Sequence, residues 1–134
     1  MVAMPLRKLL HAAALAIGGI VPAAEMAAAD DGAIFRRLLR LHDTYYGYGV
    51  AEYCGLNTFE VYDGYERQVS YLLLTTGIDK DTEREIRISG YVDADYQFDN
   101  HGLGGFRRWC QLEGERAARD FIDFRNLELA EPDE

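Results

Sequence analysis

Two cysteines far apart in the sequence set the strictest condition on the fold of this chain. Cys54 and Cys110 are the only cysteines among its 134 residues. An even number of cysteines in an exported chain predicts a disulfide, because the compartments outside the cytoplasm are oxidising. Closing a loop of this length stabilises a fold by about 4 kcal/mol when the loop-closure entropy of the unfolded chain is counted. The architecture must therefore bring the two cysteines together.

Export itself is predicted by residues 1–29, which have the three parts of a secretory signal peptide. Arg7 and Lys8 give a positive start, an apolar run without acidic residues follows, and small residues stand before Asp30. The run is shorter than the ~20 residues that span a bilayer. We predict that residues 1–29 are cleaved off and that the mature protein is periplasmic or secreted, without stable membrane insertion. An uncleaved amino-terminal anchor is the alternative.

Two helices are predicted in the first half of the mature sequence. Asp30 or Asp31 is placed to cap the first of them, over residues 33–53. Its apolar residues recur at helical spacing: Ile34, Phe35, Leu38, Leu41, Tyr45 and Tyr48. The second helix follows Asn57, which forms a capping-box pattern with Glu60, and Gly77 gives its stop signal.

The third segment supports two interpretations. Residues 79–83 carry the acids typical of a helix start, whereas residues 86–98 alternate between apolar and polar in the manner of a strand. A strand here would need residues 71–75 as its partner, which gives an alternative α+β fold with a short hairpin around residues 71–96. An isolated hairpin has little stability. We therefore predict a helix, which Gly90 can break.

A glycine-rich stretch, residues 102–105, leads into the fourth segment. Its apolar residues share one helical face: Phe106, Trp109, Cys110, Ala117, Phe121 and Phe124. We therefore expect residues 30–125 to form a single all-α domain, a small antiparallel four-helix arrangement with one disulfide. In up-and-down order the end of the first helix and the start of the fourth, where the cysteines stand, lie at the same pole. Residues 126–134 are expected to be an acidic flexible tail.

Net charge and motif content exclude several classes of function. The formal charge of −9 argues against nucleic-acid binding, because phosphate recognition needs clustered Lys and Arg. The acids between Asp93 and Asp99 alternate as in calcium loops, but Phe98 and Gly104 stand where such a loop needs Gly and Glu. We expect no metal and no cofactor.

Catalytic residues are not predicted either. Glu113 falls on the apolar face of the fourth segment, where burial would raise its pKa and make it a candidate proton donor. Pairing with an arginine such as Arg36 or Arg67 is the alternative interpretation of the same residue.

Tyrosines are frequent, with nine in the chain. Tyrosine suits interfaces because it buries a large area and keeps a polar tip, although it also serves in cores. The candidate partner-binding residues gather at one predicted pole: Tyr45, Tyr46, Tyr48, Tyr53, Tyr62, Tyr65 and Trp109.

These features favour a non-enzymatic protein: a binding or accessory subunit, an inhibitor, or an immunity-type module that docks on a larger periplasmic partner. Its small size, its acidity and its disulfide are the grounds for this hypothesis. An acid-stress periplasmic chaperone is the first alternative. The second is a hydrolase of unrecognised type that uses Glu113 or the acids between Asp93 and Asp99.

Overall fold

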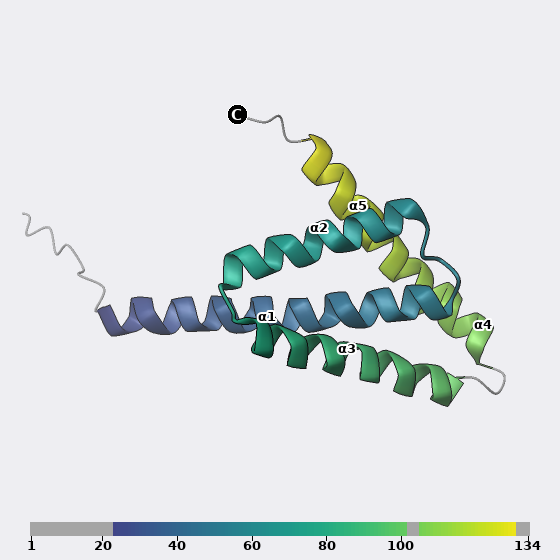
Figure 1. Ribbon diagram of the computed structural model, residues 1–134, viewed down its shortest axis with the longest axis horizontal. Coiled ribbons are helices and arrows are strands. Elements are labelled where there is room, and N and C mark those ends of the chain that lie inside the picture. Colours follow the sequence, from purple (N-terminus) through teal and green to yellow (C-terminus); the bar gives the residue numbers. More distant parts are fainter. Residues whose placement is uncertain (1–22, 102–104, 131–134) are drawn as a thin grey trace, which may run out of the picture.

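The computed structural model describes residues 23–101 and 105–130, whose regular structure is entirely helical (Figure 1). The long helices are α1 (Ala23–Tyr53), α2 (Phe59–Thr76) and α3 (Lys80–His101). The last segment consists of α4 (Phe106–Trp109), the π-helical turn η1 (Cys110–Gly114) and α5 (Glu115–Ala130). The predicted all-α four-helix arrangement is confirmed. The alternative hairpin around residues 71–96 is wrong, because those residues lie in α2, α3 and the turn between them.

Helix α1 begins earlier than the sequence pattern indicated. It starts at Ala23 and passes through Asp30 and Asp31, so neither residue stands at its start. The alanines upstream of Asp30 favour helix strongly. The signal peptide predicted over residues 1–29 overlaps this helix, residues 1–22 lie outside the described part, and cleavage before Asp30 stays a prediction. No helix in the described part is long and apolar enough to cross a membrane.

Both ends of α2 are fixed by residues that flank it. Thr58, rather than the predicted Asn57, is the N-cap, and its side chain accepts from the Val61 N–H at 3.5 Å. At the other end Gly77 takes the left-handed conformation with a φ of 62°, which glycine tolerates best. Its N–H donates to the Leu73 carbonyl at 3.1 Å, and the chain turns into α3.

Helix α3 runs through Gly90 without a break. A Cβ atom at Gly90 would lie 2.7 Å from Tyr45 Cβ and 2.8 Å from the His42 carbonyl oxygen. At Gly49 a Cβ atom would lie 2.9 Å from Ala94 Cβ. These small residues let the backbones of α1 and α3 approach closely, so Gly90 serves helix packing and does not end the helix.

Helix α5 leans on α2 and crosses it where the two backbones touch (Figure 1). A Cβ atom at Gly64 of α2 would lie only 2.0 Å from the carbonyl oxygen of Phe121 in α5. Beside this crossing, Arg125 Nε donates to Asp63 Oδ2 at 2.7 Å. This charge-assisted bond lowers the pKa of Asp63, and Arg67, which also donates to it, adds to the effect.

The end of α5 is held by an ion pair to α2. Arg67 Nη1 donates to Glu128 Oε2 at 3.2 Å, and α5 continues to Ala130. The helix thus reaches into the segment 126–134, which we expected to be a flexible tail, because Glu128 has a partner across the helix pair. Residues 131–134 lie outside the described part.

The four segments alternate in direction around α1 (Figure 1). Helix α3 lies along one flank of α1 and runs parallel to it, while α2 and α5 run in the opposite direction. The central core is formed by side chains of α1, α2 and α5: Leu41, Tyr45, Tyr48, Val61, Tyr65, Leu72 and Phe121. The sulfur atoms of Cys54 and Cys110 lie 2.04 Å apart and join the end of α1 to η1, at a shared pole as the topology predicted.

Candidate functional site

The predicted tyrosine patch divides into core residues and accessible ones. Tyr45, Tyr48, Tyr65 and Trp109 are buried. The rings of Tyr48 and Tyr65 stack with their centroids 4.1 Å apart, inside the core between α1 and α2. These four aromatic side chains belong to the two buried hydrophobic clusters and are used for packing. A partner can reach only the remaining three: Tyr46, Tyr53 and Tyr62.

Three tyrosines of α1 donate their hydroxyl groups to carboxylates on other elements. Tyr45 donates to Glu83 Oε1 at 2.5 Å, and Tyr53 donates to Asp95. Tyr46 donates to Glu113 Oε2 at 2.6 Å, so the partner of Glu113 is neither of the arginines that we considered. Burial raises the pKa of Tyr45 and of Tyr46, and the bonded carboxylates raise both further.

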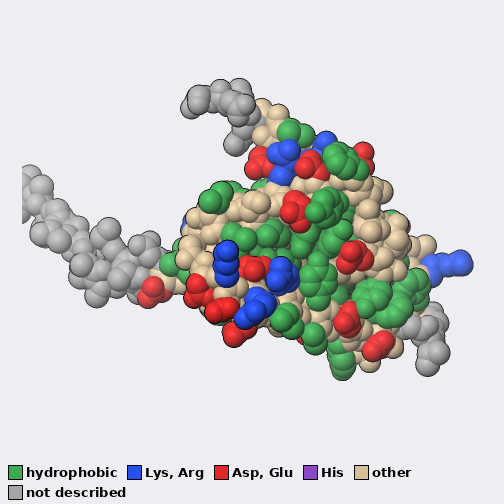
Figure 2. All heavy atoms as spheres, viewed as in Figure 1, with side chains coloured by type: hydrophobic (Ala, Val, Ile, Leu, Met, Phe, Trp, Pro, Cys, Tyr) green, Lys and Arg blue, Asp and Glu red, His purple; other side chains and the backbone are tan. Residues whose placement is uncertain are grey.

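An exposed apolar row follows the side of α3 that faces away from α1. Ile88, Val92 and Tyr96 are spaced four residues apart and are 55%, 55% and 64% exposed. Acidic residues at helical spacing share this side of α3: Asp81, Glu85, Asp95 and Asp99. Figure 2 shows hydrophobic and acidic side chains next to one another where α3 runs. We call this surface the outer α3 face.

The outer α3 face explains the strand-like alternation of the sequence. Ile86, Gly90, Ala94 and Phe98 form a second row with the same spacing of four, offset by two residues, and this row faces α1. Two apolar rows with this offset give a period of two in the sequence although the segment is helical. The row that starts at Ile86 packs against α1. The row that starts at Ile88 is equally apolar, and the described residues leave it exposed.

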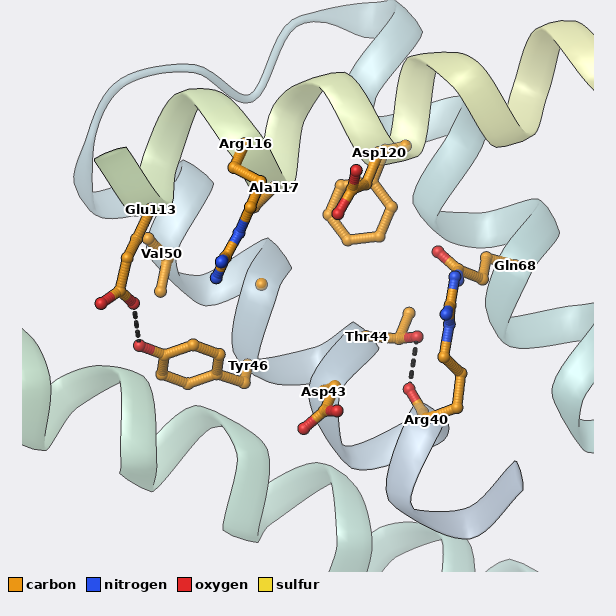
Figure 3. A pocket seen from close by; sticks show the side chains of 12 residues that line it. Arg40, Asp43, Thr44, Tyr46, Val50, Gln68, Glu113, Arg116, Ala117 and Asp120 are labelled. Atoms are coloured by element: carbon orange, nitrogen blue, oxygen red, sulfur yellow. Dashed lines mark hydrogen bonds between the residues drawn. The ribbon is translucent and has the colours of Figure 1, made fainter. Parts of the chain in front are cut away.

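Accessible polar groups gather in a cleft of about 450 Å³ between α1, the middle of α2 and the η1–α5 segment (Figure 3). Its floor is formed by small and apolar residues together with one amide: Thr44, Gly47, Val50, Gln68, Ala117 and Phe121. Its rim carries charges of both signs: Arg40, Asp43, Glu113, Arg116 and Asp120. At the floor of the cleft α5 meets α1 at Gly47, where a Cβ atom would lie 3.5 Å from Ala117 Cβ.

Several polar groups in the cleft have no partner within the described part of the chain. Arg40, Arg116 and Asp120 form no ion pair there, and Asp43 contacts only His42 Nδ1, at 3.3 Å. Gln68 is only 6% exposed, and its side-chain amide makes no hydrogen bond to a described residue. The amide lines the cleft, where it offers a donor and an acceptor to a molecule that enters.

The π-helical turn η1 closes one end of the cleft and carries the disulfide. A Cβ atom at Gly114 would lie 2.8 Å from Cys54 Sγ, so only glycine leaves room for the bridge at this position. The widened turn rotates Glu113 towards Tyr46 while Cys110 reaches Cys54. The sequence pattern did not reveal this turn, although a glycine within an otherwise helical stretch was its signal.

Groups that would suggest metal-dependent chemistry do not converge. His42 Nε2 lies 3.0 Å from Asp93 Oδ2 and links α1 to α3, but the described residues contain no cluster of three His, Cys, Asp or Glu side chains placed to hold a metal.

Comparison with known proteins gives no relative: no family, no curated protein and no solved structure matches the chain.

Proposed function

We propose that this protein is a small, exported, non-enzymatic binding module that docks on a larger periplasmic partner through the outer α3 face. The observation that carries the proposal is the row Ile88, Val92 and Tyr96, which is exposed although it is as apolar as the row that faces α1. Apolar contact area of this kind, rimmed by polar residues, is typical of protein interfaces.

Charge indicates what kind of partner fits this face. Asp81 is paired with Arg84 at 2.9 Å, which leaves Glu85, Asp95 and Asp99 as the uncompensated charges around the row. A second copy of the chain would bring the same acids against them, and like charges repel at an interface. A segment with apolar side chains flanked by Lys or Arg complements the face, and the net charge of −9 attracts such a segment from a distance.

One end of α1 extends the face. Tyr53, which was among the predicted binding residues, stacks on Phe98 with ring centroids 4.2 Å apart and donates to Asp95. The residue is 37% exposed, so a partner that binds beside Asp95 can reach its ring. Aromatic side chains held in one orientation lose little entropy when they bind a partner.

The experiment compares two double variants, each of which replaces exposed apolar residues by serine. Ile88→Ser with Val92→Ser alters the outer α3 face, and Leu112→Ser with Leu129→Ser alters equally exposed positions on η1 and α5. Tagged proteins are used to capture partners from periplasmic extract, and circular dichroism checks that both variants are folded. We expect the first variant to lose the partners of the unaltered protein and the second to keep them.

Binding is also measured with a synthetic peptide of defined sequence. An amphipathic peptide of leucine and lysine is expected to bind the unaltered protein in a salt-sensitive manner and to lose affinity for the Ile88→Ser, Val92→Ser variant. A leucine and glutamate peptide of the same pattern is the matched control. If both double variants capture the same partners and bind the lysine peptide equally well, docking through the outer α3 face is refuted.

A further inference from the structure

The cleft between α1 and α5 lies on the side of α1 away from α3 and needs an occupant of different chemistry (Figure 3). Its volume of about 450 Å³ is in the range of small-molecule sites and is too small for a folded partner. We infer that the cleft binds a small zwitterion, a free amino acid or a molecule with the same pair of charged groups.

The two arginines supply the anion-binding half of the site. Arg40 comes from α1 and Arg116 from α5, and Figure 3 shows both guanidinium groups directed into the cleft from opposite walls. A guanidinium group binds a carboxylate through two parallel hydrogen bonds, which fixes the orientation of the ligand. Either arginine is placed to hold the carboxylate of an amino acid.

The two aspartates supply the cation-binding half. Asp43 and Asp120 also come from α1 and α5, and their carboxylates lie between the two arginines in Figure 3. A simple anion in the cleft would meet these acids, and a simple cation would meet the arginines. A zwitterion satisfies both, because its ammonium group faces the aspartates while its carboxylate faces an arginine.

These charges could have neutralised one another along their own helices, but they do not. Arg116 and Asp120 are four residues apart and Arg40 and Asp43 are three apart, which are the spacings at which helical ion pairs form. Neither pair is made in the structure. The four side chains are therefore available to a ligand.

The floor of the cleft adds a group that recognises both parts of a zwitterion. The amide of Gln68, which lines the cleft, offers a donor and an acceptor. Gly47 makes the cleft deeper, because it has no side chain and leaves space in front of Ala117 and Phe121.

Binding is measured with the purified oxidised protein and a panel of the free amino acids, each up to about 10 mM. Trp109, the only tryptophan of the chain, packs in one cluster with Val50 and Tyr46 of the cleft, so its fluorescence reports occupancy. Calorimetry gives the affinity. We expect at least one amino acid to bind, and its N-acetyl and amide derivatives, which each lack one charge, to bind about tenfold more weakly or worse.

Matched variants locate the binding. Arg116→Gln and Asp120→Asn are each expected to reduce the affinity for the same amino acid by about tenfold. Their controls are Arg119→Gln and Asp123→Asn, which change exposed residues of α5 that do not line the cleft.

The inference is overturned if no amino acid of the panel binds, if the N-acetyl or amide derivative binds as well as its parent, or if the cleft and control variants behave alike. Because the outer α3 face is not altered in any of these proteins, failure here leaves partner docking standing.

Discussion

Glycines lie at the helix contacts on both flanks of α1, the flank that faces α3 and the flank that faces α5. The first flank is closed, and the second carries the cleft. On the α3 flank, Gly90 and the pair Gly49 and Ala94 bring two backbones together directly, and the flank is closed. On the other flank α5 makes its closest backbone contact with α2, at Gly64, and meets α1 at Gly47, at the floor of the cleft. Two backbones are therefore in direct contact on the α3 flank, whereas a cleft lies between α1 and α5 on the other flank.

The difference also decides where each kind of ligand can bind. The closed flank gives a continuous helix whose far side is free, which suits a long apolar segment of another protein. The open flank gives a cleft with charged residues at its rim, which suits a small polar molecule. Substitutions at the glycines of both flanks test whether their packing causes this division.

Substitution Gly64→Ala has the largest expected effect. The new Cβ would lie 2.0 Å from a backbone oxygen of Phe121, which cannot move without shifting α5. We expect a loss of more than about 4 kcal/mol in the free energy of unfolding, measured with urea, or failure to fold. If Gly64→Ala were as stable as the unaltered protein, α5 would not be held by this crossing.

Removal of the disulfide by the double change Cys54→Ser and Cys110→Ser comes next. The bridge closes the pole where both flanks end, and its sequence separation of 56 residues corresponds to about 4 kcal/mol of loop-closure entropy. Urea unfolding of oxidised, reduced and serine forms measures the difference. Equal stability of the oxidised and serine forms, or two free thiols in protein isolated from its native compartment, would contradict the account.

Substitution Gly90→Ala tests the closed flank. A Cβ there would lie 2.8 Å from the His42 carbonyl oxygen, and the neighbouring Tyr45 leaves it no room. We expect a loss of about 1–3 kcal/mol, because α3 can shift outward on the side where none of the described helices covers it. Urea unfolding gives the value, and a neutral result would mean that the closed flank is held by side chains alone.

Alkaline pH should weaken the contacts that the tyrosines make from α1 and α2. Burial raises the pKa of Tyr45, Tyr46 and Tyr65 in the folded state above the ordinary value of about 10. Their contribution to stability is therefore complete below about pH 10 and is lost as the pH rises towards the folded-state values. Unfolding by urea at a series of alkaline pH values tests this, with tyrosinate absorbance as the second signal. Ionisation of these three phenols without any loss of stability would contradict it.

Substitution Gly47→Ala has the smallest effect, and its sign is opposite. The new Cβ would lie 3.5 Å from Ala117 Cβ and 3.7 Å from Phe121 Cζ, both ordinary contacts. We expect the free energy of unfolding to rise by about 1 kcal/mol, because alanine favours helix over glycine. The methyl group also reduces the cleft, so amino acid binding should weaken while the protein becomes more stable. Gly32→Ala, in α1 but outside the cleft, is the control.

The sequence predicted the helices and their order because apolar periodicity and capping residues are local signals. It did not predict which aromatic residues remain exposed. Tyr48 and Tyr62 have the same chemistry, and only the approach of α2 to α1 buries the first and leaves the second accessible. The cleft was missed for a similar reason. Its arginines and aspartates are ordinary surface residues in the sequence, and the approach of α5 to α1 and α2 that brings them together is a long-range contact.

The account assigns partner docking to the α3 side of α1 and amino acid binding to the cleft on the other side. The most direct test is chemical-shift mapping of the isotope-labelled protein with two probes in turn. The account predicts that the leucine and lysine peptide shifts the amide signals of residues 81–99 on the outer α3 face and leaves those of Gly47, Gln68 and Ala117 unchanged. A bound amino acid should do the reverse. Shifts at the same residues with both probes, or shifts in neither region, would contradict the account.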